Sequence, residues 1–151
     1  MAWTTPKTDW ETGELVAASD MNKIGENLAT LKQPATAVYT TTENITDQSR
    51  NSFADVDSNF NLTLITTGGD VMVHFHGCLS YGDRKFDVEV DGSRIGDSNH
   101  GLWSTHPHDY QVSVTHLIQG LSAGSHTFKL QSKGGNSQTL RIGTQFWVRE
   151  I

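Results

Sequence analysis

The sequence contains a single cysteine, Cys78, among 151 residues. One cysteine excludes an internal disulfide and a cysteine-rich zinc site, so we expect packing or partner subunits to hold the fold together. No stretch approaches the roughly 20 apolar residues that a membrane span requires. The N-terminus lacks the basic and then apolar run of a signal peptide. The protein is therefore expected to be made in the cytosol, to be soluble and to have no membrane partner.

Basic residues are scarce as well. Lys and Arg number 11 against 17 Asp and Glu, which gives a formal net charge of -6. Binding to nucleic acid depends on a basic stripe that displaces counterions from phosphates, and the sequence has none. Nucleic acid is therefore not an expected partner.

Catalytic signatures are also missing. The sequence has no Gly-x-Ser-x-Gly elbow, no phosphate loop and no His-Glu-x-x-His motif. Hydrolysis by paired carboxylates is the remaining option, and the residue types for it occur at Asp83, Asp87, Glu89, Asp91 and Asp97. Alternation with apolar residues, however, places Asp87 and Glu89 on the solvated side of a strand. We expect neither an enzyme nor a cofactor.

What the sequence has in excess is Thr, Ser, Asn, Gly and His, a composition suited to strands and turns. From Thr36 onward apolar and polar residues alternate, as in a half-buried strand. The alternation predicts eight to ten short strands, with a hairpin at Gly68-Gly69 and a tight turn at Asp91-Gly92. The predicted fold class is all-β, an antiparallel sandwich formed by a single domain at 34–151.

A helix is predicted before the strands. Ser19 is a suitable N-cap, Asp20 favours the positive end of a helix, and Pro34 should end it, which gives a helix over 19–33. Its apolar residues form a heptad seam of two repeats, made of Met21, Ile24, Leu28 and Leu31. A short helix with Gly25 in its middle is marginal alone, so the seam must pack. It packs either on its own sheet or against identical helices on a symmetry axis.

Residues 1–18 form an irregular arm that holds Trp3, Pro6 and Trp10. Two indoles in so short an arm need burial. They either fold back onto their own chain or dock into a neighbouring protein. At the other end, the last alternating strand reaches Ile151, so we expect that strand to be paired inside a sheet or packed at an interface.

Two clusters could bind ligands. His74 and His76 lie on one face of a strand, and three copies could place six imidazoles around a metal ion. Met72 and Cys78 on the same face instead favour a hydrogen-bonded, partly buried surface, so no metal is predicted. The second cluster is a loop rich in rings, and it could contact a carbohydrate or a protein, or Trp103 could simply close the end of the sandwich. This loop contains His100, Trp103, His106, His108 and Tyr110.

Two parts of the chain resemble a known group of proteins. Residues 3–10 (WTTPKTDW), 13–16 (GELV) and 18–24 (ASDMNKI) resemble the N-terminal segment of small structural proteins of tailed bacteriophages and prophages. Residues 62–71 (LTLITTGGDV), 86–92 (FDVEVDG) and 120–130 (GLSAGSHTFKL) resemble the jelly-roll heads of phage fibres, a shape shared with C1q and tumour-necrosis-factor heads. The resemblance implies a virion location, an N-terminal anchor and a trimeric head, and it brings no catalytic residues.

The predicted function is therefore a structural protein of a phage virion. In the leading interpretation it is a trimeric fibre or receptor-binding head, attached through its arm, that contacts a host-surface glycan or protein. A trimeric capsid decoration protein or head fibre without a ligand is the alternative, and a free carbohydrate-binding lectin domain is a third. The expected partners are two further copies and other virion proteins.

Overall fold

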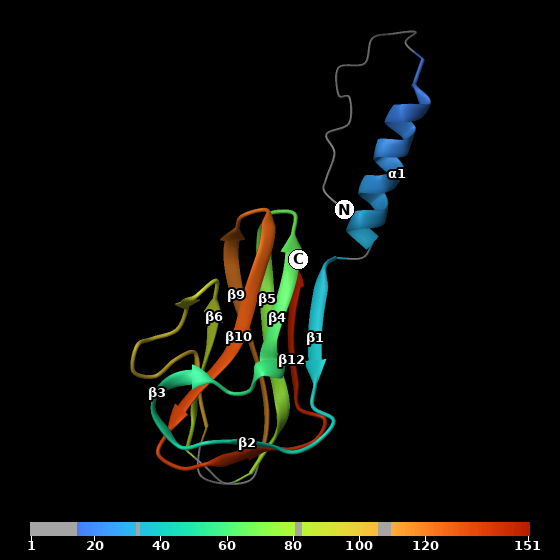
Figure 1. Ribbon diagram of the computed structural model, residues 1–151. Coiled ribbons are helices and arrows are strands. Elements are labelled where there is room, and N and C mark those ends of the chain that lie inside the picture. Colours follow the sequence, from blue (N-terminus) through green and yellow to red (C-terminus); the bar gives the residue numbers. More distant parts are fainter. Residues whose placement is uncertain (1–14, 33, 81–82, 106–109) are drawn as a thin grey trace. The chain divides into compact units, whose positions relative to one another are not determined.

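The computed structural model describes residues 15–32, 34–80, 83–105 and 110–151. They fall into two compact units, one ending at Pro34 and one beginning at Ala35. The first contains helix α1 (Ala18–Lys32) and the second contains every strand of the described residues. Each unit is described by itself (Figure 1).

Helix α1 begins one residue before the predicted Ser19 start. Asp20 lies in its first turn, where a carboxylate is favourable, and forms an ion pair with Lys23 at 3.5 Å. Three residues of the predicted seam have described side chains, and all are exposed: Met21 at 57%, Ile24 at 39% and Leu28 at 52%. Leu31 lies in the helix, but its side chain is outside the described residues.

The second unit is built from strands that are all paired antiparallel. A single turn of 3-10 helix, η1 (Ser58–Phe60), precedes the fourth strand. The strands are β1 (Thr36–Thr40), β2 (Ile45–Asp47), β3 (Arg50–Asp55), β4 (Asn61–Thr66), β5 (Gly69–Leu79), β6 (Lys85–Val90), β7 (Ser93–Arg94), β8 (Trp103–Ser104), β9 (Tyr110–Leu121), β10 (Gly124–Gly134), β11 (Gln138–Leu140) and β12 (Gln145–Glu150).

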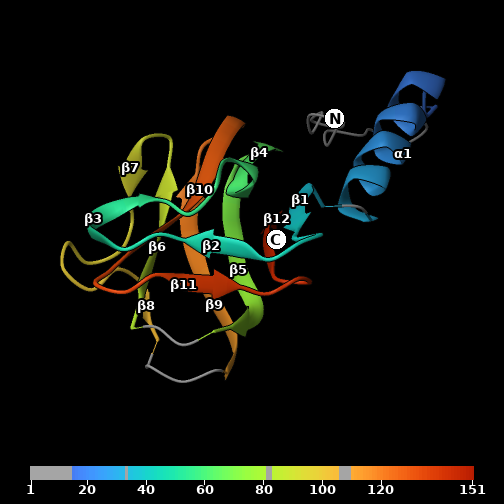
Figure 2. The same ribbon diagram turned by 60° about the horizontal axis from the view of Figure 1, so that its bottom comes forward.

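The order of these strands is that of a jelly-roll sandwich. One sheet contains β1, β12, β5 and β9 side by side, and β11 and β2 continue it at the end of β5 (Figures 1 and 2). In the other sheet, β10 is flanked on one edge by β4 and β3 and on the other by β6, which also pairs with β7 and β8. Strands far apart in the sequence, such as β1 and β12, are therefore neighbours, as in Greek-key folds. The predicted fold class is confirmed.

The core lies between the two sheets and follows the predicted alternation. On β5 the apolar side, Val71, Val73 and Phe75, is fully buried. Phe86 and Phe128 on the opposite sheet are also fully buried. Removing one such side chain from water stabilises the fold by about 2 kcal/mol. The period of two in the sequence therefore places the core correctly.

The predicted hairpin at Gly68-Gly69 is wrong. The two glycines have φ values of +98° and +147° and do turn the chain, but they lead from β4 in one sheet to β5 in the other. The two strands are not paired, because β4 pairs with β10 and β5 with β12 and β9. The tight turn at Asp91-Gly92 is confirmed, since it joins β6 to its partner β7.

The prediction that Asp87 lies on a solvated face is also wrong. Its side chain is fully buried and is contacted by Arg94 of β7 and by Gly96 of the loop after it. The carboxylate accepts a hydrogen bond from Nη1 of Arg94 at 3.0 Å and another from the backbone N–H of Gly96 at 2.9 Å. Asp87 therefore fastens the loop to the sheet.

Candidate interaction surfaces

The sheet of β1, β12, β5 and β9 has one side toward the core and one side away from it. We call the second side the outer face. Aligned cross-strand partners form its rows, and one row runs from Val38 through Trp147 and His74 to Thr115. The outer face comprises Thr36, Val38, Thr40, Met72, His74, His76, Cys78, Gln111, Ser113, Thr115, Leu117, Gln145, Trp147 and Arg149.

The predicted histidine pair lies at the centre of the outer face. The ring of His74 stacks on Trp147, with 4.9 Å between centroids and 22° between planes, and on His76 at 6.1 Å. Its Nδ1 lies 2.9 Å from Oγ1 of Thr115. Burial, together with the neighbouring His76, lowers the pKa of His74. At neutral pH His74 is therefore an uncharged ring in an aromatic stack.

The outer face is almost free of charge. Arg149 is its only cationic residue apart from the histidines, and none of its residues is a carboxylate. Asp70 lies beyond these rows at the start of β5, where its carboxylate accepts a hydrogen bond from the backbone of Gly120 at 2.9 Å. Apolar side chains remain exposed on it, including Val38 at 57% and Leu117 at 41%. For a chain with a net charge of -6, this is a surface that two copies can bring together without like-charge repulsion.

The described residues give no support for a metal site at the histidine pair. Among the described residues, no group of three or more His, Cys, Asp or Glu side chains is placed to hold a metal ion. Cys78, on the same face, is a free and exposed thiol. Within the described residues, no helix is long and apolar enough to cross a membrane.

The ring-rich loop is divided between structural and exposed residues. Trp103 lies in β8 opposite Phe86, where it is partly buried and packs against the core. His100 is exposed and its Nδ1 lies 3.0 Å from Oδ1 of Asp97. Tyr110 begins β9, but its side chain is outside the described residues, as are His106 and His108. Ligand contact at this loop stays a prediction.

The proposed attachment residues Trp3, Pro6 and Trp10 also lie outside the described residues. Of the carboxylates considered for hydrolysis, Glu89 pairs with Lys129, whose Nζ lies 2.9 Å from Oε1. Asp91 contacts the ring of His126. Like the buried Asp87, these two groups have partners within the fold.

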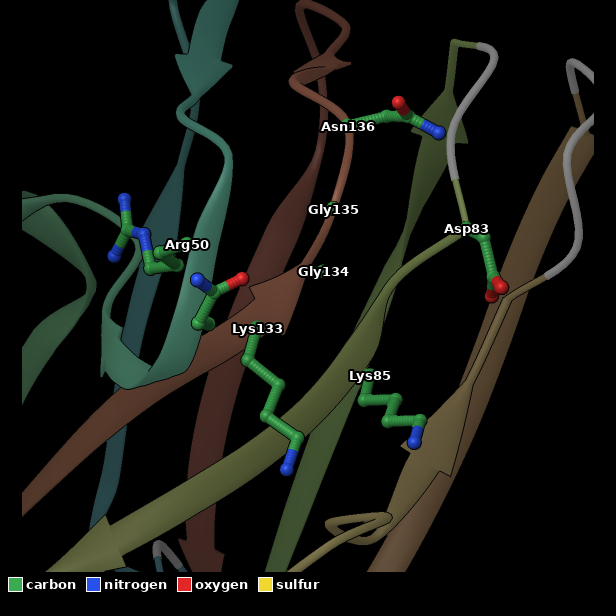
Figure 3. A pocket seen from close by; sticks show the side chains of 8 residues that line it. Arg50, Asp83, Lys85, Lys133, Gly134, Gly135 and Asn136 are labelled. Atoms are coloured by element: carbon green, nitrogen blue, oxygen red, sulfur yellow. The ribbon is translucent and has the colours of Figure 1, made fainter.

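One surface was missed by sequence reasoning. It is an open groove of about 370 Å³ at the ends of β3, β10 and β6. We call it the lysine groove, because Lys85 and Lys133 lie in it as direct cross-strand partners. Figure 3 shows the two lysines extending in the same direction from neighbouring strands, and Asp83 and Asn136 line other parts of the groove. Their proximity depends on the register of β6 and β10, which are about 40 residues apart in the sequence and show no matching signal.

Neither a known protein-family profile nor a curated protein matches the sequence. Solved structures are similar only in shape. The Eiger TNF from S. frugiperda aligns at 13% identity and a TM-score of 0.47, covering 79% of this chain and 94% of that one. A family two carbohydrate esterase from Clostridium thermocellum aligns at 14% identity and 0.37, covering 72% of this chain and 30% of that one. The infectious bursal disease virus Gt strain structure aligns at 11% identity and 0.34, covering 76% and 32%. The jelly-roll assignment rests on the strand order itself.

Proposed function

We propose that the chain is a structural protein of a phage virion, a trimeric fibre or receptor-binding head that attaches to the particle through its N-terminal arm. The observation that carries the proposal is the outer face, a partly apolar surface without carboxylates on an acidic chain. Covering Val38 and Leu117 with a second copy removes apolar surface from water and brings no carboxylates together.

A second surface supports the same assembly. Met21, Ile24 and Leu28 follow a heptad spacing on α1 and are exposed in the single chain. A seam of this kind is buried when identical helices pack together around an axis. Three copies, rather than two, are proposed because the N-terminal segment and the head segments resemble those of trimeric phage proteins.

The attachment role is assigned to the arm, because Trp3 and Trp10 bring large apolar surfaces to a segment with no regular sequence period. Its test is incorporation into particles. In a phage encoding the Trp3→Ala, Trp10→Ala double variant, we expect purified virions to lack the protein while the variant still folds. Immunogold electron microscopy of wild-type virions should place the head on the outside of the particle.

Two results would argue against this role. One is normal incorporation of the double variant, which would move attachment away from the arm. The other is purified virions in which the wild-type protein is absent, which would remove the structural role altogether.

A further inference from the structure

From the lysine groove we infer a binding site for an acidic saccharide, meaning a sugar that bears a carboxylate, sulfate or phosphate group. The inference deepens the proposed receptor-binding role and rests on it for the biological source of the sugar. It starts from the register of two strands. Lys133 of β10 is the direct cross-strand partner of Lys85 of β6.

Two like charges directly opposite each other destabilise a sheet, so this pair is costly for the fold. The same strands show the opposite arrangement four residues further along, where Lys129 faces Glu89 and its Nζ lies 2.9 Å from the carboxylate. The sheet thus compensates one lysine with an acid and leaves the other pair without one. A bound anion would supply the missing charge.

The immediate surroundings do not neutralise the two ammonium groups. Nζ of Lys85 donates to the backbone carbonyl of Asn99 at 3.1 Å, and Nζ of Lys133 to that of Ser98 at 3.5 Å. Both acceptors are uncharged. Among the described residues neither lysine has an ion-pair partner, and the carboxylate of Asp83 in the groove forms no ion pair with them.

Two arginines lie near the lysines, and each is paired with an acid. Nζ of Lys133 lies 4.9 Å from the ring centroid of Phe53, and the guanidinium of Arg94, which pairs with Asp87, lies 4.2 Å from the same centroid. Arg50 also borders the groove, although its guanidinium is held by Asp47 and by the backbone carbonyl of Asp55. The two lysines, which have no ion-pair partner among the described residues, are therefore the groups that would attract an anion to the groove.

The remaining groups favour a sugar over a simple anion or a nucleic acid. The amides of Asn51 and Asn136 and the carboxylate of Asp83 can donate to or accept from hydroxyl groups. A carboxylate in the groove repels a compact phosphate, whereas it suits a sugar that has hydroxyls on one side and an acid on the other. None of the described residues that line the groove is aromatic, and the nearby ring of Phe53 lies beneath two cations, so these residues offer no free ring for a base to stack on.

The test is an array of paired oligosaccharides probed with the full-length protein at 0.15 M salt. The pairs are uronic-acid oligomers with their methyl esters, sulfated with desulfated galactans, phosphorylated with dephosphorylated mannose oligomers, and sialylated with desialylated lactose. We expect at least one acidic member to bind about tenfold or more tightly than its neutral partner. Inorganic phosphate alone should bind more weakly than that member.

Substitutions of single lysines test whether the saccharide binds in the lysine groove. Lys85→Glu should abolish binding while keeping or raising the melting temperature, by about 2 °C, because it places a carboxylate opposite Lys133. Lys133→Gln should also lose binding. Lys129→Gln removes a lysine from the same strand outside the groove and should bind like the wild type.

The inference is overturned if no acidic member binds, if phosphate alone binds as tightly, or if binding survives Lys85→Glu. These outcomes are separate from the proposed assembly. A monomeric chain that binds the sugar through the two lysines would refute the trimer and support the binding site in the lysine groove. A trimer that binds no member of the array would support the assembly and refute the binding site.

Discussion

Nδ1 of His126 lies 2.6 Å from Oδ2 of Asp91, which stands in the turn between β6 and β7. The other ring nitrogen, Nε2, lies 2.9 Å from the backbone carbonyl oxygen of Ser122. A carboxylate and a carbonyl only accept hydrogen bonds, so the ring satisfies both when both nitrogens carry a proton. The hydrogen bond with Asp91 accordingly raises the pKa of His126, which is buried among polar partners.

This contact predicts a pH dependence of stability. Because the folded-state pKa of His126 is raised, its contribution is present below the ordinary histidine pKa and is lost as the pH rises through the raised value. The pKa of Asp91 is lowered, mainly by the backbone N–H of Thr127, so its own contribution is intact above its ordinary range. We expect His126→Gln to cost about 2 kcal/mol at pH 5.5 and clearly less at pH 9.

Thermal melting of the wild type and the variant at the two pH values measures the difference. His100→Gln is the matched control, because its ring is exposed and its contact with Asp97 should contribute little. Equal losses for His126→Gln at both pH values would show that the ring contributes by packing alone.

A second prediction concerns the buried ion pair of Arg84 and Asp47, whose Nη2 and Oδ2 atoms are 2.8 Å apart. Burial raises the pKa of Asp47 and lowers that of Arg84, so the pair is costly to bury. Arg84→Met removes a positive charge that compensates the buried carboxylate of Asp47. The substitution should lower the free energy of unfolding by about 3 to 5 kcal/mol. The double variant Arg84→Met, Asp47→Leu should recover much of this loss.

Urea unfolding of the two single variants and the double variant gives the coupling between the residues. Additive losses would mean that the two charges do not depend on each other. Lys129→Gln, which removes a partly exposed pair, should change stability by less than about 1 kcal/mol.

A third prediction tests the outer face. Val38→Glu adds a carboxylate to this surface in every copy. Assembly through the outer face would then bring the added carboxylates close together at low dielectric, where they repel each other. Because Val38 is 57% exposed in the single chain, the variant should fold but assemble at least about tenfold more weakly. Ile65→Glu is the control: Ile65 is 72% exposed on β4 of the other sheet, and the change should leave assembly intact. Sedimentation velocity over a concentration series compares the two, and equal assembly of both variants would exclude the outer face as the interface.

A fourth prediction tests the seam of α1. Leu28→Asp should weaken assembly, because it places like charges together on an otherwise dry axis. Asn22→Asp adds the same charge to the outside of the helix and should have little effect. The same sedimentation series measures both, and a Leu28→Asp protein that assembles normally would mean that the helix lies outside the interface.

The alternation of apolar residues was sufficient to predict the long strands and their buried sides. Phe75 and Phe128 are buried, as the alternation of apolar residues in their strands predicts. Short polar strands such as β2 and β11 were not predicted, because three residues carry no period and their pairing comes from tertiary contacts. Gly68-Gly69 indicated a turn correctly, but a local signal cannot tell a hairpin from a crossing between sheets.

The candidate sites could likewise be predicted from the sequence only in part. The histidine pair could be placed on one face of a strand from sequence, but its stacking on Trp147 depends on the register of β5 and β12. The lysine groove likewise appears only when β6 and β10 are aligned. Surfaces built from several strands are set by pairing between distant segments, and single-sequence patterns do not contain that information.

Assembly of the full-length chain is tested most directly by its mass in solution. Size-exclusion chromatography with multi-angle light scattering at micromolar concentration should give three times the protomer mass of 16.6 kDa. A mass of one protomer across that concentration range would contradict the proposal that the outer face and the α1 seam are covered by two further copies.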